Sequence, residues 1–395
     1  RYACRARMSL LVMPMLADLA ADACFIGAAA GCLYSLGAAF LVHRFRVETE
    51  PPQHPAAAVS IFKPLHGSEP ELERRLAAFC KQSYAGQVQV IFGCIDANDS
   101  AIPAVKRLKE MHPDADIELV AGGPLTGGNR KISNLINMTG AARHDVFVVS
   151  DSDIEVGAFY LEQVVPALDR RGVGAATCLY YGIASGNKAP ANLSALAINA
   201  HFLPQVLVAI RFGLGQPCFG ATIALRREML DKIGSFRSFA NSLADDYAIG
   251  NAVRAAGCKV SIPSFLVGHL CAERTFGEFF VRQLRAARTI KSIKPAGFAG
   301  AVIANPFPLA LIAVLAGASG LLAVASILCR IVLCKAVERK FRLPRQKSWL
   351  LPATDLALFA VFLLSFFGSG VAWRGLHYRV LPDGTLAQID KDRPD

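Results

Sequence analysis

Long apolar runs and ordinary amphipathic stretches alternate along the 395 residues of the sequence. Residues 24–42 are an uncharged run, long enough to cross a bilayer as a helix. A second apolar run, residues 298–334, is broken by Pro306, Pro308 and a Gly-rich turn, and a third covers 349–370. The pattern predicts a membrane anchor near the N-terminus and a second membrane region near the C-terminus.

The part between these runs has the patterning of a globular α/β domain. Apolar strands and amphipathic helices alternate, with strands expected at 59–62, 88–96, 117–122 and 145–153 and helices at 69–82 and 103–112. This alternation predicts a mainly parallel sheet flanked by helices. Ligands of such sheets bind at the carboxyl ends of the strands.

The predicted organisation has eight parts. They are a tail at 1–23, a transmembrane anchor at 24–43, a linker at 44–58, a globular cytoplasmic domain at 59–294, a membrane hairpin at 295–334, a basic loop at 335–348, a transmembrane or re-entrant helix at 349–370 and a C-terminal tail at 371–395. The number of crossings stays open, because the two halves of 298–334 are short for full spans. A re-entrant or interfacial element is the alternative.

Charge refines this picture. Hydrophobic residues make up 53% of the chain and charged residues 18%, which favours a mixed membrane and globular protein. The net charge of +11 comes from Lys and Arg that gather beside apolar runs, as in 335–347. That placement suits lipid headgroups and a cytoplasmic location of these loops, not nucleic acid. We expect a multi-pass membrane protein whose globular domain is in the cytoplasm.

The eleven cysteines form no C-x-x-C pair, so neither a zinc site nor a disulfide framework is indicated. Reduced thiols are the expectation. The strongest chemical signal is instead acidic. Asp151 and Asp153 follow an apolar strand, and two carboxylates at this spacing can hold one Mg²⁺ or Mn²⁺ together with substrate phosphates. A helix cap explains the pair equally well.

Other polar groups occur at comparable positions. Asp96 ends a second strand, and Asp245 with Asp246 precedes a helix, although turn and cap roles suit these acids too. The segment "GGNRKISNL" (127–135) offers Asn129, Lys131 and backbone N–H groups to phosphates, or is an ordinary loop before a helix opened by Ser133 and Asn134. Basic residues precede the second apolar run, where lipid headgroups are the simpler partners; they include Arg282, Arg285 and Lys291.

The order of these blocks resembles the family 2-like inverting glycosyltransferases of GT-A fold, of the family 21 type. The chain looks closest to bacterial ceramide glucosyltransferases and hopanoid-biosynthesis glycosyltransferases, from about residue 24 to 385. The resemblance is carried by "IFKPLHG" (61–67), "GCID" (93–96), "GGNRKISNL" (127–135), "SDSDI" (150–154), "TCLY" (177–180), "PCFGATIALRREML" (217–230), "LADDYAIG" (243–250), "VGHLCAE" (267–273), "RQLRAARTI" (282–290) and "WRG" (373–375).

This resemblance implies roles for the candidate residues. Asp96 is expected to contact uridine, and Asp151 and Asp153 to bind the metal. Asp246 matches the general base, with Asp245 as the fallback. Arg282 and Arg285 match the R/Q-x-x-R-W element that holds the diphosphate. The implied reaction is transfer of glucose, N-acetylglucosamine or another hexose from a UDP-sugar to a lipid hydroxyl, with inversion; ceramide and hopanoid are the expected acceptors.

The acceptor side is less determined. Cys218 and Gly220 are expected to shape the acceptor pocket, since Gly allows close backbone approach. His269 is either a contact to metal or diphosphate or a buried strand-end histidine. Ala286 stands where the family has Trp, which removes a large stacking surface near the acceptor. A processive polysaccharide synthase and a catalytically impaired homologue are the alternatives; an ion transporter is disfavoured because the acids lie outside the apolar runs.

Overall fold

The computed structural model describes residues 2–45, 55–368, 370–373, 376–380 and 386–388. The chain divides into two compact units. The helical unit comprises Arg1–Phe45, Leu196–Arg211 and Thr275–Gly368, and the sheet unit comprises Arg46–Ala195, Phe212–Arg274 and Ser369–Asp395. Most of the predicted linker and C-terminal tail, with Arg374, lie outside the described residues.

The sheet unit is built on a seven-stranded mixed sheet in the order β3-β2-β1-β4-β8-β6-β9. Its strands are β1 Val59–Leu65, β2 Val88–Cys94, β3 Asp116–Ala121, β4 Val146–Val149, β6 Val173–Thr177, β8 Ile223–Arg226 and β9 Lys259–Ser261. The first four in sequence are parallel, whereas β8 runs antiparallel to both β4 and β6. The predicted parallel half is confirmed, and β8 makes the sheet mixed.

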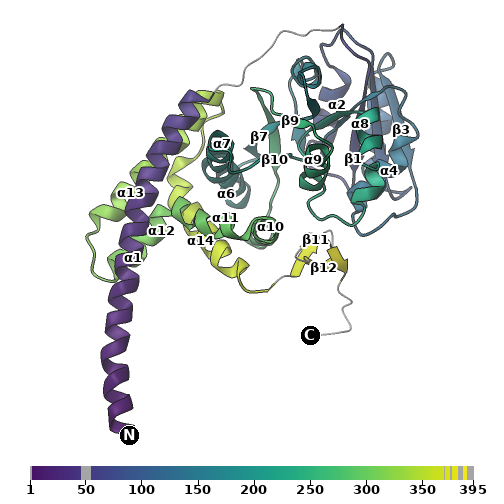
Figure 1. Ribbon diagram of the computed structural model, residues 1–395. Coiled ribbons are helices and arrows are strands. Elements are labelled where there is room, and N and C mark those ends of the chain that lie inside the picture. Colours follow the sequence, from purple (N-terminus) through teal and green to yellow (C-terminus); the bar gives the residue numbers. More distant parts are fainter. Residues whose placement is uncertain (1, 46–54, 369, 374–375, 381–385, 389–395) are drawn as a thin grey trace. The chain divides into compact units, whose positions relative to one another are not determined.

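Alternate residues of the strands enter two separate cores. Ile61 and Val148 face a core formed with α2 (Leu72–Cys80), α3 (Ile102–Met111) and α5 (Tyr160–Val164). Phe62 and Phe147 face the opposite core, formed with α4 (Arg130–Thr139), α8 (Arg227–Lys232) and α9 (Asp245–Ala255). The sheet is therefore apolar on both faces, as expected of parallel strands covered by helices (Figure 1).

Two smaller sheets complete this unit. β5 (Ile154–Glu155), β10 (Leu266–Cys271) and β7 (Leu179–Ala184) form the first, in the order β5-β10-β7. The second consists of β11 (Gly370–Trp373), β12 (Leu376–Val380) and β13 (Leu386–Gln388). The Tyr378 hydroxyl of β12 donates to the carbonyl of Gly128 at 3.3 Å, so this C-terminal sheet reaches the Gly-rich loop.

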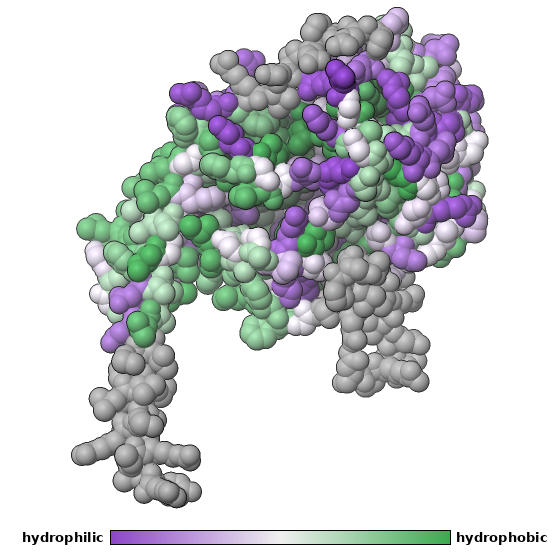
Figure 2. Space-filling model, in the orientation of Figure 1, coloured by the Kyte–Doolittle hydropathy of each residue, from purple (hydrophilic) through white to green (hydrophobic). Residues whose placement is uncertain are grey.

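The helical unit begins with α1, Tyr2–Arg44, which contains the predicted anchor. Its other helices are α7 Leu203–Arg211, α10 Phe276–Ile293, α11 Pro295–Gly300, α12 Pro306–Leu315, α13 Leu321–Phe341 and α14 Leu351–Ser365. α1 packs against α12 and α13 (Figure 1). Many large apolar side chains of α1 and α13 are exposed, and Figure 2 shows green, hydrophobic residues over these helices. Such a surface suits a lipid environment better than water.

Three described helices are long and apolar enough to cross a membrane: Asp18–Arg44, Ala189–Arg211 and Ser348–Ser365. The segments Pro295–Ala304 and Pro306–Leu315 form a pair bent by 66°, which is a broken span or a re-entrant loop. The sequence analysis left the same choice open for this region. It did not single out Ala189–Arg211, which comprises α6 (Ala189–Leu196), a π-helical turn (Ala197–Phe202) and α7.

A buried cluster of charged side chains lies inside the helical unit. Asp355 of α14 accepts hydrogen bonds from Arg330 Nε of α13 at 2.9 Å, and its other oxygen lies 2.7 Å from His201 Nε2. Arg330 Nη1 also donates to the carbonyl of Ala200, 2.8 Å away. Removing one member would leave a buried charge without its partner, so this triad ties the π-helical turn to α13 and α14.

Candidate active site

The D-x-D segment lies at the carboxyl end of β4, where the sequence predicted it. β4 ends at Val149, and the chain then turns, with Ile154 N donating to the carbonyl of Asp151 at 3.3 Å. Ser152 is buried, whereas the side chains of Asp151 and Asp153 are about one-third exposed, at 35% and 32%. The turn therefore presents both carboxylates on the accessible side.

Two buried cations hold this turn from beneath, and the sequence analysis assigned neither a role. Lys63 of β1 donates to the carbonyl of Asp151 and to Ser150 Oγ, and its ammonium lies 3.9 Å from the ring centroid of Phe79. Burial lowers the pKa of Lys63 to about 7. Arg75 of α2 donates to the carbonyl of Ser152 at 3.4 Å.

Glu69 contacts both Arg75 and the D-x-D turn. Its carboxylate accepts from Arg75 Nη2 at 2.7 Å and from Ser152 Oγ at 2.7 Å. The acidic turn is thus fixed by side chains from β1 and α2, not by its own sequence alone. The quoted block "IFKPLHG" contains Lys63, but only the fold shows that its ammonium points beneath the carboxylates.

Lys131 connects the D-x-D turn to the second acidic pair. Its ammonium lies 2.7 Å from Asp151 Oδ1 and 3.1 Å from Asp245 Oδ2. Burial acts to lower the pKa of Lys131, but the charges of Asp151, Asp245 and Asp246 outweigh it and raise that pKa above its ordinary value. Three segments predicted separately therefore meet at one ammonium group.

The position of Lys131 follows from the cap of α4. Asn129 is the N-cap, and its side-chain oxygen accepts from Ile132 N at 3.1 Å. Its amide donates to the carbonyl of Ser242 at 2.8 Å. The helix therefore begins at Arg130, and Lys131 lies in its first turn. The alternative in which an ordinary loop leads to a helix that begins at Ser133 and Asn134 is wrong.

Asp246 and Asp245 have different surroundings. Asp246 accepts from Gly220 N at 2.9 Å and from its neighbour Tyr247 N at 2.7 Å. Burial, and next the charge of Asp245, raises the pKa of Asp246 to about 6. Asp245 instead pairs with Lys131 and is 7% exposed. Asp246 is thus the acid whose pKa is raised toward neutral pH, whereas Asp245 contacts the lysine, and the general-base role stays a prediction.

Gly220 fits between these groups because it has no side chain. A Cβ at this position would lie 2.8 Å from Asp151 Oδ2 and 2.9 Å from Lys131 Nζ. The backbone of Gly220 therefore approaches these two side chains closely. Its neighbour Cys218 is buried in the core beneath, where burial raises the pKa of the thiol to about 12. The acceptor-pocket role of Cys218 and Gly220 stays a prediction.

We expect Gly220→Ala to lower kcat by about 10²-fold, because displacement of reacting groups by 1 Å has effects of that size. The added methyl group must push Lys131 or Asp151 from its place. Steady-state transfer assays would measure the change. Gly140→Ala is the matched control, since nothing lies within 4 Å of a Cβ there. Equal kcat in the two variants would contradict the close fit.

His269 of β10 lies beside the D-x-D turn. Its Nδ1 is 3.4 Å from Asp153 Oδ1, and Leu270 N donates to the carbonyl of Asp153 at 2.9 Å. The Tyr180 ring lies 5.5 Å from the imidazole, centroid to centroid. His269 is thus a half-buried residue within β10, not a buried strand-end histidine, and its contact to metal or diphosphate stays a prediction.

The remaining predicted residues lie elsewhere in the chain. Asp96 is exposed beyond the end of β2 and accepts from Asn98 N at 2.9 Å, as in a turn. Asp99, missed by the sequence analysis, is buried and joins the β1 loop by accepting from Gly67 N at 2.8 Å. Arg282, Arg285 and Ala286 lie on α10 of the helical unit. Their predicted roles stay predictions.

A divalent cation fits this site on the evidence of Lys131. Its ammonium group stands against Asp151 and so shows that the turn accepts a cation. Among the described residues no three His, Cys, Asp or Glu side chains converge as a metal cage. Mg²⁺ needs only one or two carboxylates when water and phosphates supply the other ligands. Asp151 and Asp153 meet that requirement.

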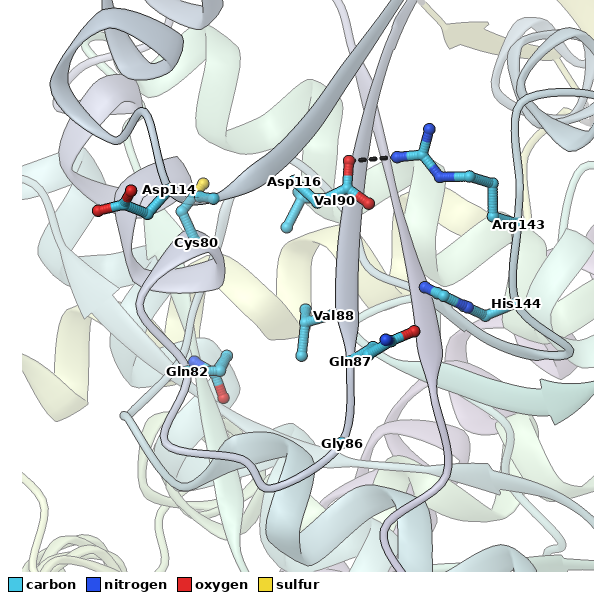
Figure 3. A pocket seen from close by; sticks show the side chains of 11 residues that line it. Cys80, Gln82, Gly86, Gln87, Val88, Val90, Asp114, Asp116, Arg143 and His144 are labelled. Carbon is cyan, nitrogen blue, oxygen red and sulfur yellow. Dashed lines mark hydrogen bonds and ion pairs between the residues drawn. The ribbon is translucent and has the colours of Figure 1, made fainter.

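A partly open pocket lies at the opposite ends of the strands. It has a volume of about 540 Å³ and is lined by residues such as Val88, His144 and the ion pair of Arg143 with Asp116 (Figure 3). Val88 and Asp116 are the first residues of β2 and β3. The pocket is therefore at the amino ends of these strands and separate from the carboxylates described above.

Comparisons with known proteins identify the family of this chain. The family model described as "Glycosyl transferase family 21" matches residues 23–386. The chain is similar to ceramide glucosyltransferase 1 of Caenorhabditis elegans, with 25% identity over 282 residues, 65% of this chain and 56% of that protein. It is 27% identical to ceramide glucosyltransferase of Candida albicans over 122 residues, 28% of this chain and 22% of the relative. The chain spans about half the length of the first relative and less of the second.

A solved structure with a similar fold is the mannosyltransferase PcManGT from Pyrobaculum calidifontis in complex with GDP-Man and Mn²⁺. Its TM-score is 0.56 at 17% identity, over 89% of this chain and 99% of that one. At this identity the likeness shows the fold alone. The expected fold, a GT-A-type mixed α/β domain with membrane helices, is confirmed.

Proposed function

Because the chain belongs to glycosyl transferase family 21, we propose that it transfers a hexose from a UDP-sugar to the hydroxyl of a membrane lipid. Glucose and N-acetylglucosamine are the proposed sugars, and a ceramide or hopanoid is the proposed acceptor. The observation that carries the proposal is the meeting of Asp151, Lys131 and Asp246 around Gly220. The similarity to ceramide glucosyltransferases supports a lipid acceptor.

The proposed reaction is a single displacement. The acceptor oxygen attacks the anomeric carbon, the bond from that carbon to the diphosphate oxygen breaks, and the acceptor proton passes to Asp246. Because one base is present and no enzyme nucleophile is needed, the configuration inverts. Lys131 supplies positive charge for the departing diphosphate once it turns from the carboxylates.

Asp151 and Asp153 would hold a divalent cation, Mg²⁺ or Mn²⁺, which neutralises negative charge on the diphosphate. Lys63 and Arg75 fix the main chain of that turn. Asp96 is proposed to contact uridine, and Arg282 and Arg285 to contact the diphosphate. Candidate spans in α1 and near the C-terminus support a multi-pass membrane protein, and we propose the bacterial inner membrane with the sheet unit in the cytoplasm.

Membranes that contain the protein provide the direct test, with radiolabelled UDP-glucose or UDP-N-acetylglucosamine and ceramide or a hopanoid polyol. We expect one lipid to become labelled in a reaction that a chelator stops. Asp153→Asn should abolish labelling while the protein still folds, because it removes one exposed carboxylate. Binding of UDP without labelling of any lipid would contradict the proposal and favour an impaired homologue.

The pH dependence follows from Asp246. A general base must be ionised, so kcat/KM is expected to fall as the pH drops through the pKa of Asp246, which is about 6 in the free enzyme. At pH values above this pKa the carboxylate of Asp246 is ionised, so kcat/KM no longer changes with its protonation. A profile of kcat/KM from pH 4.5 to about 8 would test the expectation. A constant kcat/KM down to pH 5 would exclude Asp246 as the base.

A further inference from the structure

The helix Ala189–Arg211 interrupts the sheet unit in the sequence. β6 and β7 precede it, and β8 and β10 follow it. β6 pairs with β8, and β7 pairs with β10. Both ends of the helix therefore lead into the same two sheets, which must be on one side of a bilayer.

This connection excludes a simple crossing by the helix. Its 23 residues have the length and hydropathy of a span. If the helix crossed the bilayer once, the chain after Arg211 would have to return through lipid before β8 begins at Ile223. That returning segment would be irregular, and its backbone N–H and C=O groups would lack hydrogen-bond partners in the lipid. The helix must therefore begin and end on the side of the bilayer where the two sheets are. α7 packs against α1, which carries the candidate anchor, so the helix also belongs to the membrane region.

The loop that leaves this helix is unusually apolar for exposed chain. Phe212 is 63% exposed and Leu214 is 72% exposed, with Gly213 between them at a φ of 66°. Arg211, also exposed, ends α7 directly before them. Exposed aromatic and aliphatic side chains beside an Arg are typical of a segment at the headgroup boundary of a membrane.

The same loop leads to Gly220, whose backbone N–H contacts the proposed base. A few residues beyond Leu214, Phe219 N donates to Thr177 Oγ1 at 2.8 Å and Gly220 N donates to Asp246 at 2.9 Å. One short segment thus joins a membrane-associated helix, an exposed apolar pair and the hydrogen bond that holds Asp246.

We propose that Phe212 and Leu214 bind the hydrocarbon chain of the lipid acceptor at the membrane boundary and thereby deliver its hydroxyl to Asp246. The inference rests on the proposed function and adds to it an acceptor-chain subsite. Its occupant is a lipid chain because the pair continues a span-length apolar helix and precedes the base in the chain.

The test compares two forms of one acceptor, a long-chain lipid in vesicles and its short-chain, water-soluble analogue. For Phe212→Ser/Leu214→Ser we expect KM for the long-chain form to rise about tenfold or more, with kcat unchanged, because the variant loses apolar contact. The short-chain form should change less than twofold, as should UDP affinity. Phe159→Ser/Met111→Ser is the matched control, since both side chains are comparably exposed on the sheet unit, at 58% and 51%.

Equal effects on the two acceptors, or no effect, would overturn the inference while leaving the transfer reaction established. If wild type labels no lipid at all, the proposed function fails first, and a second measurement decides the inference. Phe212→Trp, in a background where Trp349 and Trp373 are replaced by Phe, would be placed in vesicles with brominated lipids. Quenching of its fluorescence supports lipid contact, and its absence rejects the subsite.

Discussion

Asp246→Asn is expected to lower kcat by about 10²- to 10⁴-fold, the usual contribution of a general base. The amide oxygen can still accept from Gly220 N, but it cannot take the acceptor proton. UDP affinity and the unfolding temperature should change little, since the substitution preserves size and removes a carboxyl that burial disfavours. Steady-state transfer assays would measure kcat, calorimetric titration would measure UDP affinity, and thermal unfolding would give the unfolding temperature.

Asp231→Asn is the control for this variant, because Asp231 is exposed on α8 and should retain full activity. Asp245→Asn is the informative neighbour. It removes a partner of Lys131 and is expected to change UDP affinity as well as kcat. If Asp245→Asn loses more kcat than Asp246→Asn while UDP binding is unchanged, the assignment of the base must be exchanged between the two.

Lys131→Met should affect both stability and donor binding. Its ammonium is largely buried, with a side chain 11% exposed, and it separates Asp151 from Asp245. Removing one partner of a buried ion pair costs about 3–5 kcal/mol. We expect a clear fall in unfolding temperature and a loss of kcat of about 10²- to 10³-fold, because positive charge at the leaving group is lost as well. Thermal unfolding and transfer assays provide the readings.

Two further variants separate these effects. Arg130→Met changes the adjacent residue of α4, which makes no ion pair within the described part of the chain. This variant should leave the unfolding temperature and kcat near their wild-type values. Lys131→Met/Asp151→Asn neutralises one of the two carboxylates that lose Lys131, leaves Asp245 charged, and should regain part of the stability without regaining activity. Full activity in that double variant would show that the ammonium serves the fold alone.

The local patterns of the sequence were sufficient to predict the strands of the parallel half and the acids at their ends. β1, β2 and β3 lie where alternation and apolar runs placed them, because each is covered on both faces by helices. β8 could not be paired in advance. Its antiparallel place between β4 and β6 depends on contacts between segments far apart in the sequence.

The site was predictable in its acids and less so in its cations. Short motifs identify Asp151, Asp153 and Asp246, since acids after strands and before helices are visible in one dimension. Lys63 was hidden because a lysine within an apolar strand gives no sign of which atom its ammonium contacts. The helix Ala189–Arg211 was missed for a related reason. Its run contains Asn and His, which interrupt an apolar window although they are buried inside the fold.

The bridge formed by Lys131 has a consequence for the order in which the substrates react. In the ligand-free protein the charge of Lys131 acts to lower the pKa of Asp246. In the proposed reaction, a UDP-sugar that draws this ammonium to its diphosphate would weaken that effect, so Asp246 would become a stronger base when the donor is bound. An acceptor that arrives first meets a weaker base. The bridge thereby favours a sequential mechanism in which donor binding precedes activation of the lipid hydroxyl.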